Sequence, residues 1–163
     1  MRVDVYAGDG FAVFINAEAI DAMTRASDEA HPNETTGPLF GILTGGTEGG
    51  KHPAATIMEA PVAVLASSPT DCVFDGNLAS RMADERWREH QHIMLGEWHS
   101  HPNNTPTPSP VDIQRCKRNV TNPEMNMPEE IMVIVGGPPG NHEWSVHVIT
   151  AKAVHKLERV NLH

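Results

Sequence analysis

Apolar residues along this chain form short strand-like runs and helical repeats, separated by turns rich in glycine and proline. The tail from residue 151 is interpreted as a last strand, and apolar or alternating runs predict further strands at residues 11–15, 38–44, 55–65, 92–99, 131–135 and 143–150. Pro61 interrupts the 55–65 run, which indicates an edge or a bulge there. The polar segment 66–75 is predicted to be a loop, and the glycine-rich segment 45–50 a turn.

Three segments show the spacing of an amphipathic helix, at residues 17–30, 77–90 and about 110–119. Asn16 can cap the first helix, and Pro32 ends it because a residue that precedes proline is biased away from helical geometry. Strands mixed with a few helices and many short turns predict an α/β or mixed α+β fold. A length of 163 residues fits one domain, which we expect to span residues 1–163.

Charge and cysteine content narrow the classes of partner. Lys and Arg number 12 against 21 Asp and Glu, a net charge of −9 with His neutral, so the chain repels a phosphate backbone and we expect no nucleic acid. The longest apolar stretch, residues 62–66, is too short to span a bilayer, and no signal peptide is visible, so we expect no membrane. Cys72 and Cys116 lack CxxC spacing, which favours a reducing compartment and a cytoplasmic location.

The segment 96–112, GEWHSHPNNTPTPSPVD, holds the residues with the clearest chemistry. His99 and His101 lie two residues apart at the end of a predicted strand, so both imidazoles point to the same face. Neutral imidazole is a common zinc ligand. Three prolines stiffen the loop 102–108 that leads to Asp112 at the start of the next predicted helix. Two histidines, one carboxylate and an open fourth position are the layout of a catalytic zinc site.

The order His99-x-His101, seven residues, Ser109, two residues and Asp112 resembles the motif of the JAMM (MPN+, Mov34-type) zinc metallopeptidases, in particular compact, prokaryotic, deubiquitinase-like members. Glu34, within HPNETTG and ahead of the apolar run PLFGIL, is similar to the glutamate that the family places upstream. The resemblance spans about residues 11–148. It implies an MPN/JAMM domain in which helices flank a central, curved, mixed β-sheet.

The resemblance also implies a role for each motif residue. His99, His101 and Asp112 would bind Zn²⁺, with a water as the fourth ligand. Glu34 would act as the catalytic base that takes the proton of this water and passes it to the leaving amine. Ser109 would donate a hydrogen bond to the oxyanion. Zinc lowers the pKa of bound water to about 7, and one oxyanion donor contributes about 3–4 kcal/mol in the transition state.

Several of these residues have a second interpretation. Ser109 and Asp112 are close to a capping box, which would explain both without chemistry; we expect Asp112 to act as a ligand instead of the box partner. Glu97 shares the face of both histidines and could be the base, a partner behind a ligand histidine or a surface carboxylate, but we expect Glu34 to be the base. Cys116 is expected to be a buried structural thiol and not a competing ligand.

The family resemblance implies a peptidase that cuts after the Gly-Gly tail of a ubiquitin-like protein, at a peptide or isopeptide bond. Such peptidases occur with ubiquitin-activating-like and conjugating-like enzymes in bacterial conjugation or antiphage systems. Processing of a sulfur-carrier protein is the alternative. A non-catalytic MPN scaffold is disfavoured because every ligand position is filled. A zinc nucleoside deaminase would need H-x-E followed by P-C-x-x-C, and neither is present. Segments 66–75 and 105–108 are candidates for the sides of a channel for the tail.

Overall fold

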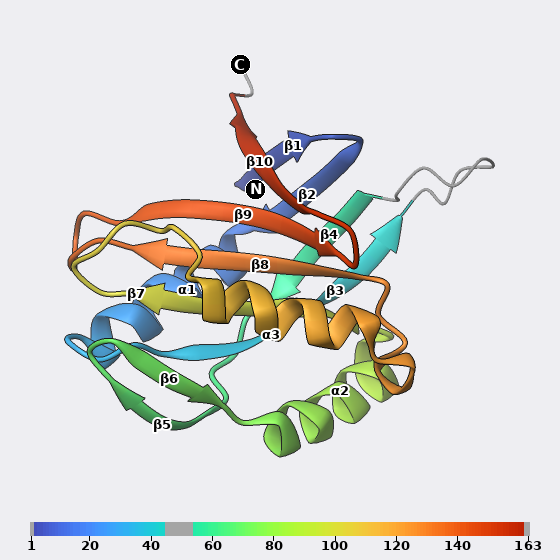
Figure 1. The fold of residues 1–163 in the computed structure, drawn as a ribbon, viewed down its shortest axis with the longest axis horizontal. Coiled ribbons are helices and arrows are strands. Elements are labelled where there is room, and N and C mark those ends of the chain that lie inside the picture. The colour runs from blue at the N-terminus through green and yellow to red at the C-terminus, as the bar shows by residue number, and fades with distance from the viewer. Residues whose placement is uncertain (1, 45–53, 162–163) are drawn as a thin grey trace.

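Eight strands close into a barrel in the computed structural model, which describes residues 2–44 and 54–161 (Figure 1). The order around the barrel is β1 (Val3–Gly8), β10 (Val154–Val160), β9 (Glu143–Thr150), β8 (Glu129–Gly136), β7 (Ile93–His101), β3 (Thr36–Thr44), β4 (Ala54–Glu59) and β2 (Phe11–Asn16). Parallel pairing occurs between β2 and β4 and between β7 and β8, while the other neighbouring strands run antiparallel, so the sheet is mixed, as predicted.

Helices cover both faces of the sheet around β7 and β8. In Figure 1, α1 (Ala17–Ala30) lies behind the sheet and α3 (Pro110–Thr121) in front of it. Met23 of α1 is fully buried in the main apolar core, which also contains Trp98 of β7. A smaller apolar cluster joins Cys116 of α3 to Met132, Ile134 and Ile149 on the other face of the sheet. The prediction that the Cys116 thiol is buried is therefore confirmed, and the strand that carries both candidate histidines is fixed from two sides.

The helix predicted at residues 17–30 matches α1, whose N-cap Asn16 accepts a hydrogen bond from the Ala19 N–H at 2.8 Å. The second helix, α2 (Gly76–His90), buries only Ala79, and the Nε–H of its Arg86 donates to Glu59 Oε2 of β4 at 3.1 Å. The guanidinium of Arg86 lies 5.7 Å from the centroid of the Phe40 ring, a cation–π contact. These contacts place α2 along β3 and β7, away from the carboxyl end of β7.

Two predictions for the middle of the chain are wrong. The strand predicted over 55–65 is two strands: β4 ends at Glu59, and β5 (Val64–Ser68) belongs to another sheet. Pro61 lies at the break, where its carbonyl accepts the Trp98 indole N–H at 3.0 Å. The loop predicted over 66–75 is mostly a hairpin, in which β5 pairs with β6 (Asp71–Phe74). Most of its residues are exposed, so the sequence carries no apolar alternation there.

Other differences lie at the ends and in the turns. β1 (Val3–Gly8) was not predicted, and it joins the barrel by pairing with β2 and β10. The strand predicted in the tail matches β10. A short 3₁₀ helix, Pro123–Met125, occupies the polar loop before β8. The glycine-rich turn predicted at 45–50 lies outside the described residues. Within the described ranges, no helix is long and apolar enough to cross a membrane.

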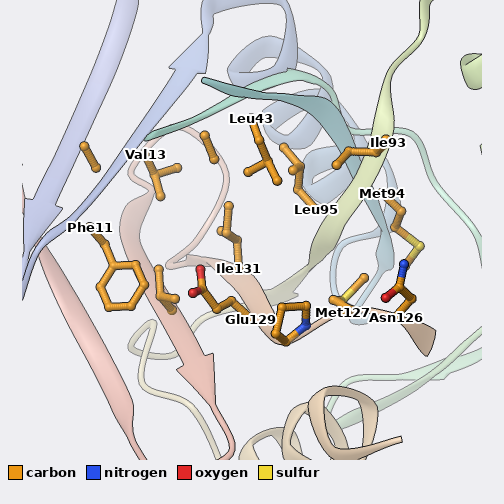
Figure 2. Close-up of a pocket in the computed structure, with 14 residues that line it drawn as sticks. Phe11, Val13, Leu43, Ile93, Met94, Leu95, Asn126, Met127, Glu129 and Ile131 are labelled. Atoms are coloured by element: carbon orange, nitrogen blue, oxygen red, sulfur yellow. The ribbon is translucent and has the colours of Figure 1, made fainter. Parts of the chain in front are cut away.

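An apolar pocket of about 110 Å³ opens at the start of β7, the end of the strand opposite to the histidines (Figure 2). Ile93, Met94 and Leu95 line it together with β2, β3 and the loop before β8, and the carboxylate of Glu129 is among its few polar groups. A strand of nine residues places its two ends about 26 Å apart. The lining of this pocket contains no histidine or cysteine, so the candidate chemistry lies at the other end of β7.

Candidate functional site

His99 and His101 end strand β7 with their imidazoles on one face, as strand alternation predicts. Their Nε2 atoms lie 3.0 Å apart. The intervening Ser100 anchors the strand on its other side: its hydroxyl oxygen accepts the Thr35 N–H at 2.9 Å, and its own N–H donates to the Thr35 carbonyl at 2.9 Å. The two histidines are thereby turned toward α3 by a strand whose end is tied to β3.

Asp112 reaches the same point from the start of α3. Ser109 caps the helix, and both halves of a capping box are present: the Asp112 N–H donates to Ser109 Oγ at 3.1 Å, and the Ser109 N–H donates to Asp112 Oδ2 at 2.8 Å. The same Oδ2 lies 3.2 Å from His99 Nε2 and 3.5 Å from His101 Nε2. The expectation that Asp112 would not be the box partner is therefore wrong: the oxygen that completes the capping box is also the one that faces the two histidines.

The three donor atoms form a group that suits a divalent metal ion. They lie 3.0, 3.2 and 3.5 Å from one another. Ligand atoms about 2.0–2.1 Å from a tetrahedral zinc ion lie about 3.3–3.4 Å apart, so the spacing needs only small adjustments. Two imidazole nitrogens and one carboxylate oxygen are also the donor types that zinc prefers at catalytic sites. His99, His101 and Asp112 are thus compatible with zinc both in spacing and in chemistry.

Hydrogen bonds around this group set its protonation. His101 Nδ1 lies 3.1 Å from the Thr105 carbonyl; because a carbonyl only accepts, Nδ1 carries a proton, and Nε2 is the nitrogen directed at His99 and Asp112. Burial opposes ionisation of Asp112, but hydrogen bonds from His101 and His99 outweigh it and hold the pKa of this carboxyl well below its ordinary value. The carboxylate is therefore ionised and available as a ligand at neutral pH.

A cleft of about 540 Å³ opens beside these donors and contains Glu34. Glu34 follows α1 and precedes β3, and its backbone N–H donates to the Ser68 carbonyl of β5 at 2.9 Å. Burial raises the pKa of Glu34, while the positive charges of His101 and His99 and a hydrogen bond from Cys72 lower it by less. A carboxylate in this setting is more basic than an exposed one. The cleft therefore brings together Glu34, His101, Ser109 and Asp112, which the sequence had singled out.

Glu97, the competing carboxylate, lies on the predicted face but not in the cleft. It is 1% exposed, and its Oε1 accepts the Nε–H of Arg115 at 2.8 Å and a second N–H from the same guanidinium. Arg115, which lines the cleft, stands between Glu97 and the open space. Of the interpretations of Glu97, the geometry favours a buried partner behind the candidate metal-binding group over a base.

Arg115 of α3 lines the cleft and was not singled out for this site from the sequence. Cys72 of β6 also lines it and was predicted only as part of the channel segment 66–75. Burial and the neighbouring Glu34 raise the pKa of the Cys72 thiol to about 12, so it is protonated at neutral pH. The sequence signal that could have identified Arg115 is helical spacing, because Val111, Asp112 and Arg115 lie on the side of α3 that lines the cleft. Parts of both predicted channel segments line the cleft, namely residues 69–72 and Thr105 with Thr107.

Comparison with known proteins identifies the family. The model of the prokaryotic homologues of the JAB domain matches residues 16–155, which include every residue of the candidate site. The chain belongs to this family. The resemblance drawn from His99, His101, Ser109, Asp112 and Glu34 is thereby confirmed at the level of the family.

This JAB-family chain is 27% identical over 141 residues to a CD-NTase/cGAS isopeptidase of Enterobacter hormaechei subsp. hoffmannii, an alignment that covers 85% of the chain and 75% of the relative. Its fold is similar to the solution structure of protein DSY2949 from Desulfitobacterium hafniense, with a TM-score of 0.63, 22% identity and 87% of each chain covered. The second similarity concerns the fold alone. Both similarities cover more than four fifths of the chain.

Proposed function

We propose that this JAB-family protein is a zinc-dependent isopeptidase or peptidase that cleaves after the C-terminal glycine of a ubiquitin-like protein or of its conjugate. The observation that carries the proposal is the convergence of His99 Nε2, His101 Nε2 and Asp112 Oδ2 beside a cleft that also contains Glu34 and Ser109. The relative named as a CD-NTase/cGAS isopeptidase supports a conjugate as the substrate.

His99, His101 and Asp112 would hold the zinc ion. When bound, zinc supplies a Lewis acid that lowers the pKa of water to about 7 and polarises a carbonyl group. Glu34, whose pKa is raised by burial, would take the proton of the attacking water and return it to the leaving amine. Its place in the cleft, beside the donors and not among them, fits a base better than a ligand.

Ser109 would donate to the oxyanion. Its Oγ accepts the Asp112 N–H, which uses a lone pair and leaves the hydroxyl proton available. Since Ser109 lines the cleft, this proton can be directed at a substrate carbonyl bound there. The cap therefore orients the hydroxyl as well as stabilising α3.

The function of the Ser109 hydroxyl can be separated from capping by a glycine substitution. Glycine replaces serine at an N-cap at a cost of only a few tenths of a kcal/mol, but it has no hydroxyl. We expect Ser109→Gly to lower kcat by about 10²–10³ while zinc content and the free energy of unfolding stay close to those of the wild type. Ser109→Thr, which keeps the hydroxyl, is the matched control. A Ser109→Gly variant with kcat within a few-fold of the wild type would remove Ser109 from the mechanism.

The β5–β6 hairpin offers a surface for the substrate beside the cleft. Among the described strands β6 pairs only with β5, so its other edge has no strand partner and could receive an extended tail by β-augmentation. Leu65 of this hairpin is 67% exposed, and Val73 and, across the cleft, Val111 of α3 are also exposed. Val111 lines the cleft, whereas Leu65 and Val73 lie outside its lining on the neighbouring hairpin; exposed apolar side chains grouped in this way are typical of a protein-binding surface. We propose that the tail lies along β6 and that the folded body of the substrate contacts these side chains.

A narrow channel for a glycine tail predicts a steric effect of the penultimate residue. Replacing the penultimate glycine of the substrate by valine should lower kcat/KM by about 10- to 100-fold, because 1–3 kcal/mol of steric strain is typical of such a misfit. The matching alanine substrate should be affected less. The rates are measured on fusions and on isopeptide conjugates of candidate ubiquitin-like and sulfur-carrier proteins. Equal rates for the valine and glycine substrates would contradict the channel.

A further inference from the structure

A buried ion pair lies directly behind the candidate metal-binding residues. Glu97 of β7 is 1% exposed and precedes His99 by two residues, on the same face of the strand. Arg115 of α3 donates two N–H groups to its Oε1, with the Nε at 2.8 Å. Burying a carboxylate is costly unless it is paired, so the contact must be tightly maintained. The pair joins the strand that carries both histidines to the helix that carries Asp112.

The same guanidinium also faces Asp112. Its Nη2, the terminal nitrogen that also donates to Glu97, lies 4.0 Å from Asp112 Oδ1, whereas Oδ2 faces His99 and His101. The two oxygens of this carboxylate therefore have different surroundings: one is directed at the donor group and the other at a cation. A cation on the Oδ1 side favours the rotamer of Asp112 that presents Oδ2 to the histidines.

The remaining neighbours of Glu97 do not make this a second metal site. Cys116 and Glu130 have donor atoms within 4.8 Å of Glu97 and of each other. However, Glu97 is paired with Arg115, and both carboxyl oxygens of Glu130 accept the Asn119 amide at 3.3 Å. Burial and the charge of Glu97 raise the pKa of Glu130 to about 8, which keeps it largely protonated at neutral pH. Arg115 is therefore the charge that balances Glu97.

We propose that Glu97 and Arg115 are positioning residues that hold Asp112 with Oδ2 toward His99 and His101, and so raise the affinity of the site for zinc without binding the ion. This inference rests on the proposed function in that it assumes a metal at these three residues. Residues that orient metal ligands from behind typically contribute a factor of about 10–100 to metal affinity. We expect a contribution of this size from the pair.

The test measures zinc affinity of the whole protein by competition with a chelating indicator, together with the visible spectrum of the Co²⁺-substituted protein. Glu97→Gln should weaken zinc binding by about 10- to 100-fold and alter the Co²⁺ bands, because Asp112 is no longer held in one orientation. Arg115→Lys keeps the positive charge but lacks the planar guanidinium that donates two N–H groups to Glu97. It should weaken zinc binding less than Glu97→Gln does. Arg118→Gln, an exposed arginine on the same helix, is the control and should match the wild type.

Arg115→Gln should weaken zinc binding as Glu97→Gln does, but it leaves Glu97 buried without its partner. The double variant Glu97→Gln/Arg115→Gln leaves no unpaired buried charge and is the variant to use if Arg115→Gln does not fold. Because the two residues act as a unit, its loss of affinity should equal that of Glu97→Gln and not the sum of two effects. Wild-type affinity and Co²⁺ bands in a folded Glu97→Gln protein would overturn the proposal, as would additive losses. Affinity needs no substrate, so a protein whose zinc affinity depends on this pair but which cleaves nothing would contradict only the proposed function.

Discussion

Replacing Glu34 by glutamine should lower kcat by about 10²–10⁴ while one zinc ion per chain is retained, because removing a general base costs about this factor and Glu34 is not a ligand. Glutamine has nearly the shape of glutamate but cannot accept the proton. Its side chain can keep the place of Glu34 beside Cys72 and His101 in the cleft. Turnover is measured at saturating zinc, and zinc content by metal analysis of the same preparation.

The control for this variant is Glu143→Gln, which removes an exposed carboxylate at the start of β9, outside the cleft. Its turnover should match the wild type. The opposite pattern would exchange the roles of the two competing carboxylates: an active Glu34→Gln protein together with a Glu97→Gln protein that is inactive at saturating zinc would make Glu97 the base. Burial of Glu97 behind Arg115 is the reason to expect the first result.

Elements with a strong local pattern could be predicted from the sequence, and those that depend on distant partners could not. The buried runs of β3, β7, β8 and β9 carry their own apolar pattern, and α1 has both its cap and its proline stop. The residues of β1 become a strand through pairing with β2 and β10, which lies more than 140 residues away in the chain. The β5–β6 hairpin buries little on either face, so cross-strand pairing and not alternation defines it.

The residues of the candidate site likewise fall into those that a local pattern predicts and those that distant elements supply. His99, His101 and Asp112 share one short segment, so their spacing on a strand end and a helix start already predicts that they converge. The neighbours that other elements supply to these residues could not be predicted: nothing in the sequence indicates that Cys72 lies beside Glu34. The expectation that Asp112 would not complete the capping box failed because a carboxylate oxygen has more than one lone pair and can accept from Ser109 while facing two imidazoles.

Removing both histidines should abolish metal binding. We expect His99→Ala/His101→Ala to lose its zinc and all turnover, because Asp112 alone supplies one ligand where a zinc site needs three or four. The matched control is His90→Ala/His92→Ala, a second pair with the same two-residue spacing, whose rings lie 5.3 Å apart at the junction of α2 and β7. That pair belongs to neither group of potential metal ligands in the described chain, so its removal should leave zinc bound.

Thermal unfolding gives a readout of metal binding that does not depend on substrate. A ligand that binds only the folded state at about 100 times its dissociation constant stabilises a protein by about 2.7 kcal/mol. Added zinc should therefore raise the Tm of the wild type and of the His90/His92 variant, and leave the Tm of the His99/His101 variant unchanged. Stoichiometric zinc in the latter protein would contradict the assignment of the metal ligands. Since the capping box holds Asp112 without any metal, the apo form of that variant should still fold, and the loss of binding would then reflect the two missing imidazoles alone.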